Sequence, residues 1–172
     1  IEYNGDITMG TSSLVTEGGN SSGKGNIGIV AENDHKVTLN GLLKTYNANG
    51  STRDGIGVYA KDSDVNLLTD YGFQIKDRGV GLYAENSETS TGTMNVRYTG
   101  ATTEAGTGAY FKGTGSNPLT NKLDINVNNV SNTTKGMIGI YAKDTNFTNE
   151  GDIQVTNTDT LGFGIISSGA DV

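Results

Sequence analysis

The residues best suited to catalysis are few in this chain and do not recur together. Among its 172 residues there is one histidine, His35, and no cysteine. A serine nucleophile needs a histidine base that a third group orients, and a glycoside-cleaving site needs two carboxylates at a set separation. The three arginines, Arg53, Arg78 and Arg97, occupy different places in the sequence repeat, and no paired carboxylate set recurs. We therefore predict that the protein is not an enzyme and has no catalytic residues.

Two kinds of motif point toward a cofactor or a metal, and both are incomplete. Residues 23–28 match G-x-G-x-x-G, but a dinucleotide site also needs a strand before this motif and a helix after it. The acidic, asparagine-rich stretches at 32–34, 62–64 and 144–146 offer oxygen ligands for calcium. The calcium-binding nonapeptide and the EF-hand loop are absent from the sequence. We predict no cofactor and no metal site.

A short segment with two glycines recurs six times, and a tyrosine follows the glycines in four of the copies. The clearest copies are GIGVYAKDSD at 55–64 and GVGLYAENSE at 79–88. The second glycine of each copy is Gly28, Gly57, Gly81, Gly108, Gly139 or Gly164. The steps between copies are 24 to 31 residues, and such variable spacing indicates a structural unit whose insertions lie in loops.

Between the copies lie short runs that alternate apolar and polar residues, which is the period of a β-strand. One set is VTL, VNLL, TMNV and FTN, at 37–39, 65–68, 93–96 and 147–149, and another is GDITM, GFQI, LDINV and GDIQV, at 5–9, 72–75, 123–127 and 151–155. Two or three short strands in each of six units predict an all-β fold. We predict a right-handed parallel β-helix (β-solenoid) of about six coils of 24–31 residues. Residues 1–172 would form a single β-helix segment, a fragment of a longer chain.

Strand alternation predicts which side chains face the core. In the copy at 54–64, Ile56, Val58 and Ala60 share the consistently apolar face, which we expect to point inward. Gly57 and Tyr59 fall on the opposite, outer face. The outer column therefore contains an aromatic ladder of Tyr59, Tyr83, Tyr110 and Tyr141.

Exposed tyrosines in a row can bind a ligand, for example by stacking on sugar rings. They can equally serve only to stabilise the sheet, because aromatic pairs on neighbouring strands contribute ~0.2–1 kcal/mol each. We treat the tyrosine ladder as the candidate ligand-binding site and keep both interpretations open.

Two further positions of the repeat also align between copies: two residues after the tyrosine lies a charged row, and one residue later lies a corner. Largely alternating signs in the charged row allow neighbouring coils to pair, at Glu32, Lys61, Glu85, Lys112 and Lys143. One residue later come types that accept a left-handed backbone or make tight turns, at Asn33, Asp62, Asn86, Gly113, Asp144 and Gly169. We predict a sharp corner there in each coil.

The composition excludes some classes of partner. The net charge is −7 and the 12 lysines and arginines are scattered, so no basic surface is available for nucleic acid. The absence of cysteine excludes disulfides and thiol chemistry. No apolar run approaches the ~18 residues of a membrane-spanning helix.

The recurring GIGVYAKDS, GVGLYAENS and GIYAKDTNFTNEGDIQV resemble the passenger repeats of type V autotransporters, most closely the RadD-like fusobacterial outer-membrane adhesins. The resemblance spans residues 1–172 and implies that they are a β-helix segment and a fragment of a longer passenger domain. It implies a β-helix stalk that is secreted through a C-terminal outer-membrane barrel of the parent chain and displayed, extracellular and outer membrane-anchored, on a Gram-negative cell surface. The family has no universal catalytic motif, so the resemblance assigns no site residue. The fourth copy departs from the repeat at Phe111 and Gly113, and the sixth at Ile166 and Ser167.

The first functional hypothesis is a non-enzymatic segment of a surface adhesin that mediates or spaces attachment to host cells or other bacteria. Its partner would be a glycan or a protein on those surfaces. Two alternatives remain: a module of a secreted β-helical carbohydrate-active enzyme or phage tailspike, and a VacA-like toxin passenger.

Overall fold

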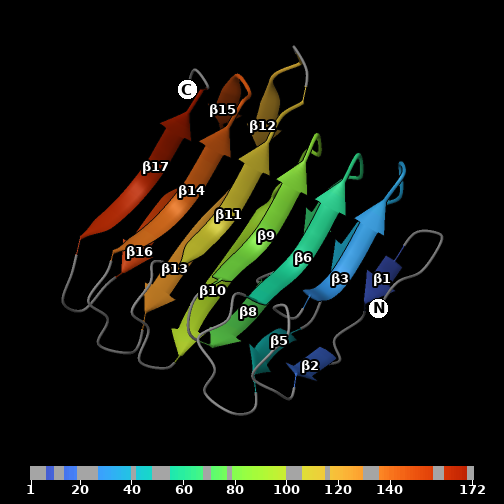
Figure 1. The fold of residues 1–172 in the computed structure, drawn as a ribbon, viewed down its shortest axis with the longest axis vertical. Helices are drawn as coiled ribbons and strands as arrows, with labels where there is room; N and C mark the ends of the chain where they lie inside the picture. The colour runs from blue at the N-terminus through green and yellow to red at the C-terminus, as the bar shows by residue number, and fades with distance from the viewer. Residues whose placement is uncertain are drawn as a thin grey trace.

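The chain folds into parallel β-sheets stacked as a β-solenoid (Figure 1). A computed structural model describes residues 7–9, 14–18, 27–39, 42–47, 55–67, 71–76, 79–99, 106–114, 117–129, 136–156 and 161–169. Every strand pair in these residues is parallel. The described residues contain no helix with the length and apolar character of a membrane span. The predicted all-β parallel solenoid is confirmed.

Two six-stranded sheets form the long walls of the solenoid. The front sheet contains β3 (Ile27–Glu32), β6 (Gly55–Lys61), β9 (Gly79–Glu85), β11 (Thr107–Lys112), β14 (Met137–Lys143) and β17 (Gly162–Ser168). The back sheet contains β2 (Leu14–Gly18), β5 (Leu42–Asn47), β8 (Tyr71–Lys76), β10 (Gly92–Thr99), β13 (Leu123–Asn129) and β16 (Ile153–Thr156). Each coil passes from the front sheet to the back sheet and returns to the next front strand, because both sheets keep the same strand order.

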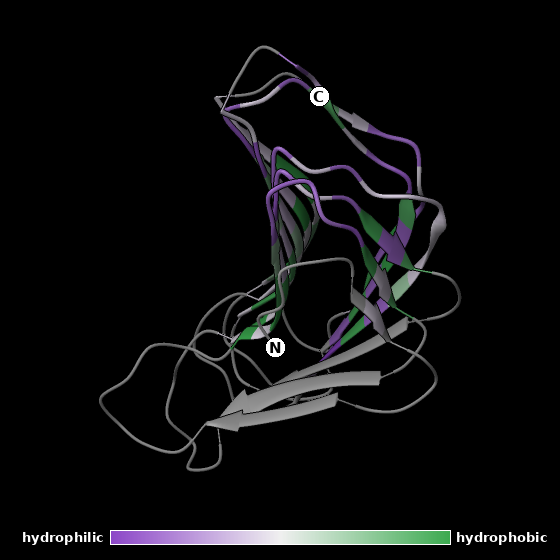
Figure 2. Ribbon diagram, turned by 90° about the vertical axis from the view of Figure 1, so that its right-hand side faces the viewer, coloured by the Kyte–Doolittle hydropathy of each residue, from purple (hydrophilic) through white to green (hydrophobic). Residues whose placement is uncertain are grey.

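Short strands form a third side between the front and back sheets. They are β1 (Ile7–Met9), β4 (Val37–Leu39) and β7 (Val65–Leu67) in one sheet, and β12 (Leu119–Asn121) and β15 (Phe147–Asn149) in another. Figure 2 looks along the stack and shows the strands as walls around the core. In Figure 1 the chain runs up the near sheet and down the far one as the coils advance to the left, which is the predicted right-handed sense.

The coil count differs slightly from the predicted six. The first coil, with β1 and β2, has no described front strand. The last coil, with β17, has no described back strand. Two runs of the predicted sets lie on other walls than their sets. TMNV at 93–96 is in β10 of the back sheet, and residues 7–9 of GDITM form β1 on the third side. Their alternation is that of any half-buried strand, so pattern alone does not say which wall each run joins.

The core fills the space between the walls with small and branched side chains. Val58, Ala60 and Leu82 of the front sheet are at most 1% exposed, as are Met94 and Val96 of the back sheet. One core tyrosine, Tyr98, is fully buried, and its hydroxyl lies 2.8 Å from the carbonyl oxygen of Gly79 and 2.7 Å from that of Thr107. The hydroxyl thus links the back sheet to β9 and β11.

The predicted alternation fails at one point in each front strand. A Cβ on Gly81 would lie 2.8 Å from Cγ2 of Val96, and one on Gly108 would lie 2.6 Å from Cγ2 of Val127, so these glycines face the core. The next residue, Leu82 or Ala109, is also buried. Two successive residues therefore point inward, and the strand pairing skips the glycine.

The residue before each glycine is consequently turned outward, which corrects the predicted inward placement of Ile56. Ile56, Val80 and Ile138 are half-buried, while Val58 is fully buried. The prediction that Gly57 lies on the outer face beside Tyr59 is wrong as well, since Gly57 is buried and its counterparts in β9 and β11 face the core. The physical cause is the close approach of the back-sheet valines, which leaves no room for a side chain.

The corners lie where the sequence predicts them. Asn33, Asp62, Asn86, Asp144 and Gly169 all have positive φ, between 48° and 64°. Asn and Asp tolerate this left-handed backbone better than other side chains do. Gly113 is the exception because its φ is not positive, and the next strand, β12, begins only at Leu119.

Candidate functional site

The four tyrosines of the predicted ladder lie side by side on the outer face of the front sheet. Tyr59 pairs with Tyr83, Tyr83 with Tyr110, and Tyr110 with Tyr141, in β6, β9, β11 and β14. Their ring centroids are 5.2, 4.8 and 5.2 Å apart, with interplanar angles of 21°, 9° and 8°. Each ring is half-buried. We call these four residues the tyrosine stack.

The geometry of the tyrosine stack determines which parts of each ring a ligand can reach. Tyr83 and Tyr110 have a parallel ring against each face. Beyond the ends of the stack, Val30 is the register neighbour of Tyr59 and Ile166 is that of Tyr141. The expected stacking of a sugar ring on the tyrosine faces is therefore not available at Tyr83 and Tyr110. A partner would meet ring edges and phenolic hydroxyls.

The hydroxyls of Tyr59, Tyr83 and Tyr110 are neutral hydrogen-bonding groups. Partial burial is the main cause that raises the pKa of Tyr59, Tyr83 and Tyr110 above 10.0. The carboxylate of Glu85 raises the pKa of Tyr59 and Tyr83 further, whereas Lys112 lowers it. At neutral pH these groups keep their protons, so each can both donate and accept a hydrogen bond.

A charged row runs beside the tyrosine stack. The carboxylate of Glu85 lies 3.2 Å from Nζ of Lys112 and 3.9 Å from Nζ of Lys61, so the expected pairing between neighbouring coils is present here. The hydrogen bond from Lys112 to Glu85 is the main cause that raises the pKa of Lys112. Lys143 breaks the alternation because it adjoins Lys112 in register, and its Nζ is 4.0 Å from Oδ2 of Asp144.

On the other side of the stack lies a row of outward aliphatic residues, Ile56, Val80 and Ile138. The outer face of the front sheet thus has three parallel rows, which are aliphatic, phenolic and charged. Such a face can bury apolar area, exchange hydrogen bonds through the hydroxyls and form ion pairs at one margin.

The other sequence candidates do not gather near the tyrosine stack. His35 is half-buried at the first corner, where its backbone N–H donates to Oγ of Ser63 over 3.2 Å. Within the described residues, no three His, Cys, Asp or Glu side chains gather as metal ligands. Residues 23–26 of the glycine motif, Arg53 and Arg78 lie outside the described residues.

Polar side chains inside the coils were not predicted as structural elements. Oγ of Ser63 accepts from His35 N–H, and Oγ of Ser87 accepts from Ser63 N–H at 3.0 Å. Asn121 is fully buried and donates to Leu123 C=O and to Oδ1 of Asn149, each at 2.8 Å. The signal in the sequence was the hydroxyl residue that follows the corner at 63, 87 and 145. The serine contacts satisfy backbone N–H groups of the preceding coil, and Asn121 satisfies a carbonyl of its own coil and links to the next coil through Asn149.

No protein-family model, curated protein or solved structure matches the chain.

Proposed function

We propose that this chain is a non-enzymatic β-solenoid segment of a bacterial surface adhesin of the autotransporter type, and that the outer face of its front sheet contacts a partner. The observation that carries the proposal is the continuous tyrosine stack along four successive coils. A stack of half-exposed rings at constant spacing presents the same hydroxyl in each coil, so a partner can engage several at once.

The solenoid itself supports a spacing role. Consecutive coils pair through both walls, so the described coils stack along one axis at the ~4.8 Å strand separation of a β-sheet. The parent protein would anchor this stack at the outer membrane of a Gram-negative bacterium and hold the tyrosine face outside the cell. The partner would be a glycan or a protein on a host cell or on another bacterium.

The proposal is tested by coating beads with the purified chain and measuring the retention of epithelial cells and of bacteria. The double variant Tyr83→Phe/Tyr110→Phe keeps the stack and removes two hydroxyls. Each lost hydrogen bond is worth ~1 kcal/mol, so we expect retention to require several-fold more protein on the bead. Tyr83→Ser/Tyr110→Ser, which also removes the ring edges, should reduce retention further.

The matched control changes the opposite wall. Asn128 and Gln154 are exposed on β13 and β16, so Asn128→Ser/Gln154→Ser should leave retention unchanged. Circular dichroism and thermal melting of each variant report whether the solenoid is intact. Undiminished retention by both tyrosine variants, with the fold intact, would refute the tyrosine face as the contact surface.

A further inference from the structure

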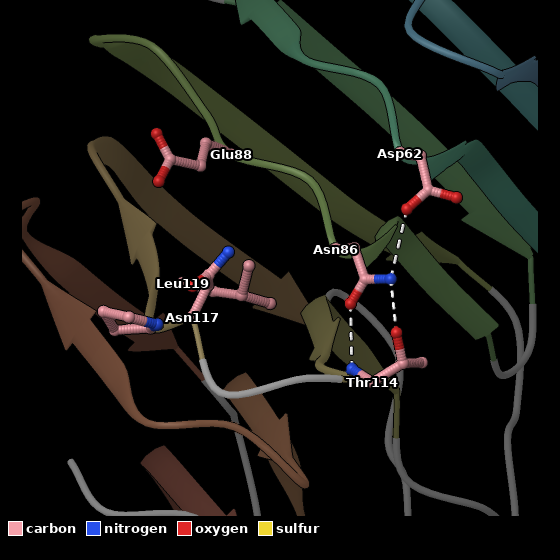
Figure 3. Close-up of a pocket in the computed structure, with 7 residues that line it drawn as sticks. Asp62, Asn86, Glu88, Thr114, Asn117 and Leu119 are labelled. Atoms are coloured by element: carbon pink, nitrogen blue, oxygen red, sulfur yellow. Dashed lines mark hydrogen bonds between the residues drawn. The ribbon is translucent and has the colours of Figure 1, made fainter.

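An open hollow of about 390 Å³ lies at the corner between the front sheet and the third side (Figure 3). This volume falls in the range of small-molecule sites, ~300–1,000 Å³. The hollow is separate from the tyrosine stack and lies beyond the charged row. Its lining residues are Asp62, Asn86, Glu88, Thr114, Asn117, Pro118 and Leu119.

The hollow lies where the regular stacking of the coils is interrupted. The sheet β1–β4–β7 and the sheet β12–β15 are separate. Between them the coil of β9 adds only the isolated bridge of Thr89 to Val65. Toward β12, the link is made by the side chain of Thr89. Its Oγ1 lies 3.1 Å from Oδ1 of Asn121 and accepts a hydrogen bond from Lys122 N–H at 2.9 Å. A side-chain link thus replaces a backbone ladder next to the hollow.

Thr114, Asn117 and Pro118, which lie between β11 and β12, supply one wall of the hollow. β7 and β15 begin four positions after the preceding front strands end, whereas β12 begins at Leu119, seven positions after β11 ends at Lys112. Asn86 holds Thr114 in place. Its Nδ2 donates to Oδ1 of Asp62 at 3.1 Å and to Oγ1 of Thr114 at 2.5 Å, and its Oδ1 accepts from Thr114 N–H at 2.8 Å. Figure 3 shows Asn86 between Asp62 and Thr114. The wall is therefore braced before any ligand arrives.

The lining combines groups that recognise hydroxyls with an apolar side. Among the described residues no ion pair or side-chain hydrogen bond engages the side chain of Glu88, and Asp62 accepts the hydrogen bond from Asn86 through Oδ1. Thr114 and Asn117 are exposed and add a hydroxyl and an amide, while Pro118 and Leu119 add apolar surface. Carboxylates accept strong hydrogen bonds from hydroxyl groups, and apolar side chains pack on C–H surfaces.

The negative charge of the lining restricts the class of ligand that the hollow can bind. Asp62 and Glu88 are acidic, and none of the described residues that line the hollow is a lysine or an arginine. The chain as a whole carries a net charge of −7. An anionic ligand would be repelled, whereas a neutral molecule with several hydroxyls meets acceptors on both sides.

We propose that this hollow binds a neutral sugar unit, with Asp62 and Glu88 accepting hydrogen bonds from its hydroxyls and Pro118 packing against its ring. The inference rests on the proposed contact role, but it names the ligand class and assigns it to the corner rather than to the tyrosine stack. The interruption of the third side and the hollow coincide next to Thr114, Asn117 and Pro118, and Pro118 is the single proline of the chain.

The test uses the full 172-residue chain and neutral gluco-, galacto- and manno-configured disaccharides, with a glucuronate-containing disaccharide for comparison. Two-dimensional NMR titration should shift the amide signals of Thr114 and Asn117 with at least one neutral disaccharide, and far less with the acidic one. Glu88→Gln and Asp62→Asn keep side-chain shape and remove one charge each. Each should weaken binding about tenfold, because a charge-assisted hydrogen bond becomes a neutral one.

The matched control is Asp144→Asn, which changes the same corner position in a coil without the hollow, and it should leave affinity unchanged. The variant Tyr83→Phe/Tyr110→Phe should also leave sugar affinity unchanged, which separates this inference from the bead assay. Absence of any shift with the neutral panel, or equal binding of the acidic disaccharide, would overturn the inference. Shifts in wild type that persist unaltered in Glu88→Gln and Asp62→Asn would also overturn it.

Discussion

The glycine in the middle of each front strand determines how closely the two walls approach. A Cβ on Gly139 would lie 2.6 Å from the carbonyl oxygen of Gly164 and would collide with Cγ2 of Ile153. Neither neighbour can yield easily, because one is backbone and the other is a branched, partly buried side chain that packs against the core. Glycine is therefore required here by lack of space.

Replacing Gly139 with alanine should destabilise the solenoid. Overpacking of this kind costs ~1–3 kcal/mol, so we expect the free energy of unfolding in urea to fall by about that amount. Gly164 provides a matched control, because a Cβ there meets nothing within 4 Å. Gly164→Ala should change the free energy of unfolding by less than ~0.5 kcal/mol. Equal losses in the two variants would contradict the steric explanation.

At the scale of the strand, β10 is joined to two front strands by one buried hydroxyl. Burial raises the pKa of Tyr98 far above 10.0, although its hydrogen bond to Thr107 lowers it in part. The folded protein thus holds this phenol in its neutral form. The unfolded chain ionises Tyr98 near its ordinary pKa of ~10.

The stability of the fold should depend on Tyr98 at alkaline pH. Below pH ~10 both states are protonated and the contribution of Tyr98 is fully present. Above it the unfolded state releases the proton first, so the free energy of unfolding falls by up to ~1.4 kcal/mol per pH unit from this group. Urea unfolding of Tyr98→Phe and wild type from pH 7 to 11 measures the effect. The variant should lose ~1 kcal/mol at neutral pH but show the shallower alkaline decline, and parallel curves would refute the assignment.

In the whole molecule, the stability of each coil depends mainly on its contacts with the adjacent coils of the parallel stack. The front sheet has the order β17–β14–β11–β9–β6–β3, so each coil pairs only with the one before it and the one after it. In such quasi-linear architectures the stability is close to a sum of coil and interface contributions. Local damage should therefore remain local.

Hydrogen exchange of Gly139→Ala should show this directly. We expect amide protection to fall in β11, β14 and β17, and to change much less in β3 and β6, because those strands share no interface with the altered coil. Mass spectrometry of peptides from each strand measures the difference. A uniform loss of protection along the chain would instead indicate a single cooperative unit.

The sequence alone was sufficient to predict the features that recur at equal positions of successive coils. Tyr59, Tyr83, Tyr110 and Tyr141 stack because equal positions in successive coils become neighbours. The corners at Asp62 and Asn86 follow from residue types that accept a left-handed backbone. Both features depend only on local conformation and on the repeat, which a sequence displays.

The tertiary structure decided what depends on the opposite wall and on the adjoining coil. The inward turn of Gly81 and Gly108 is imposed by Val96 and Val127, which strict alternation along one strand does not take into account. The hollow lined by Thr114, Asn117 and Pro118 lies where the third side is split and Thr89 bridges the split through its side chain. These features arise from contacts between distant segments, and only the closed coils bring those segments together.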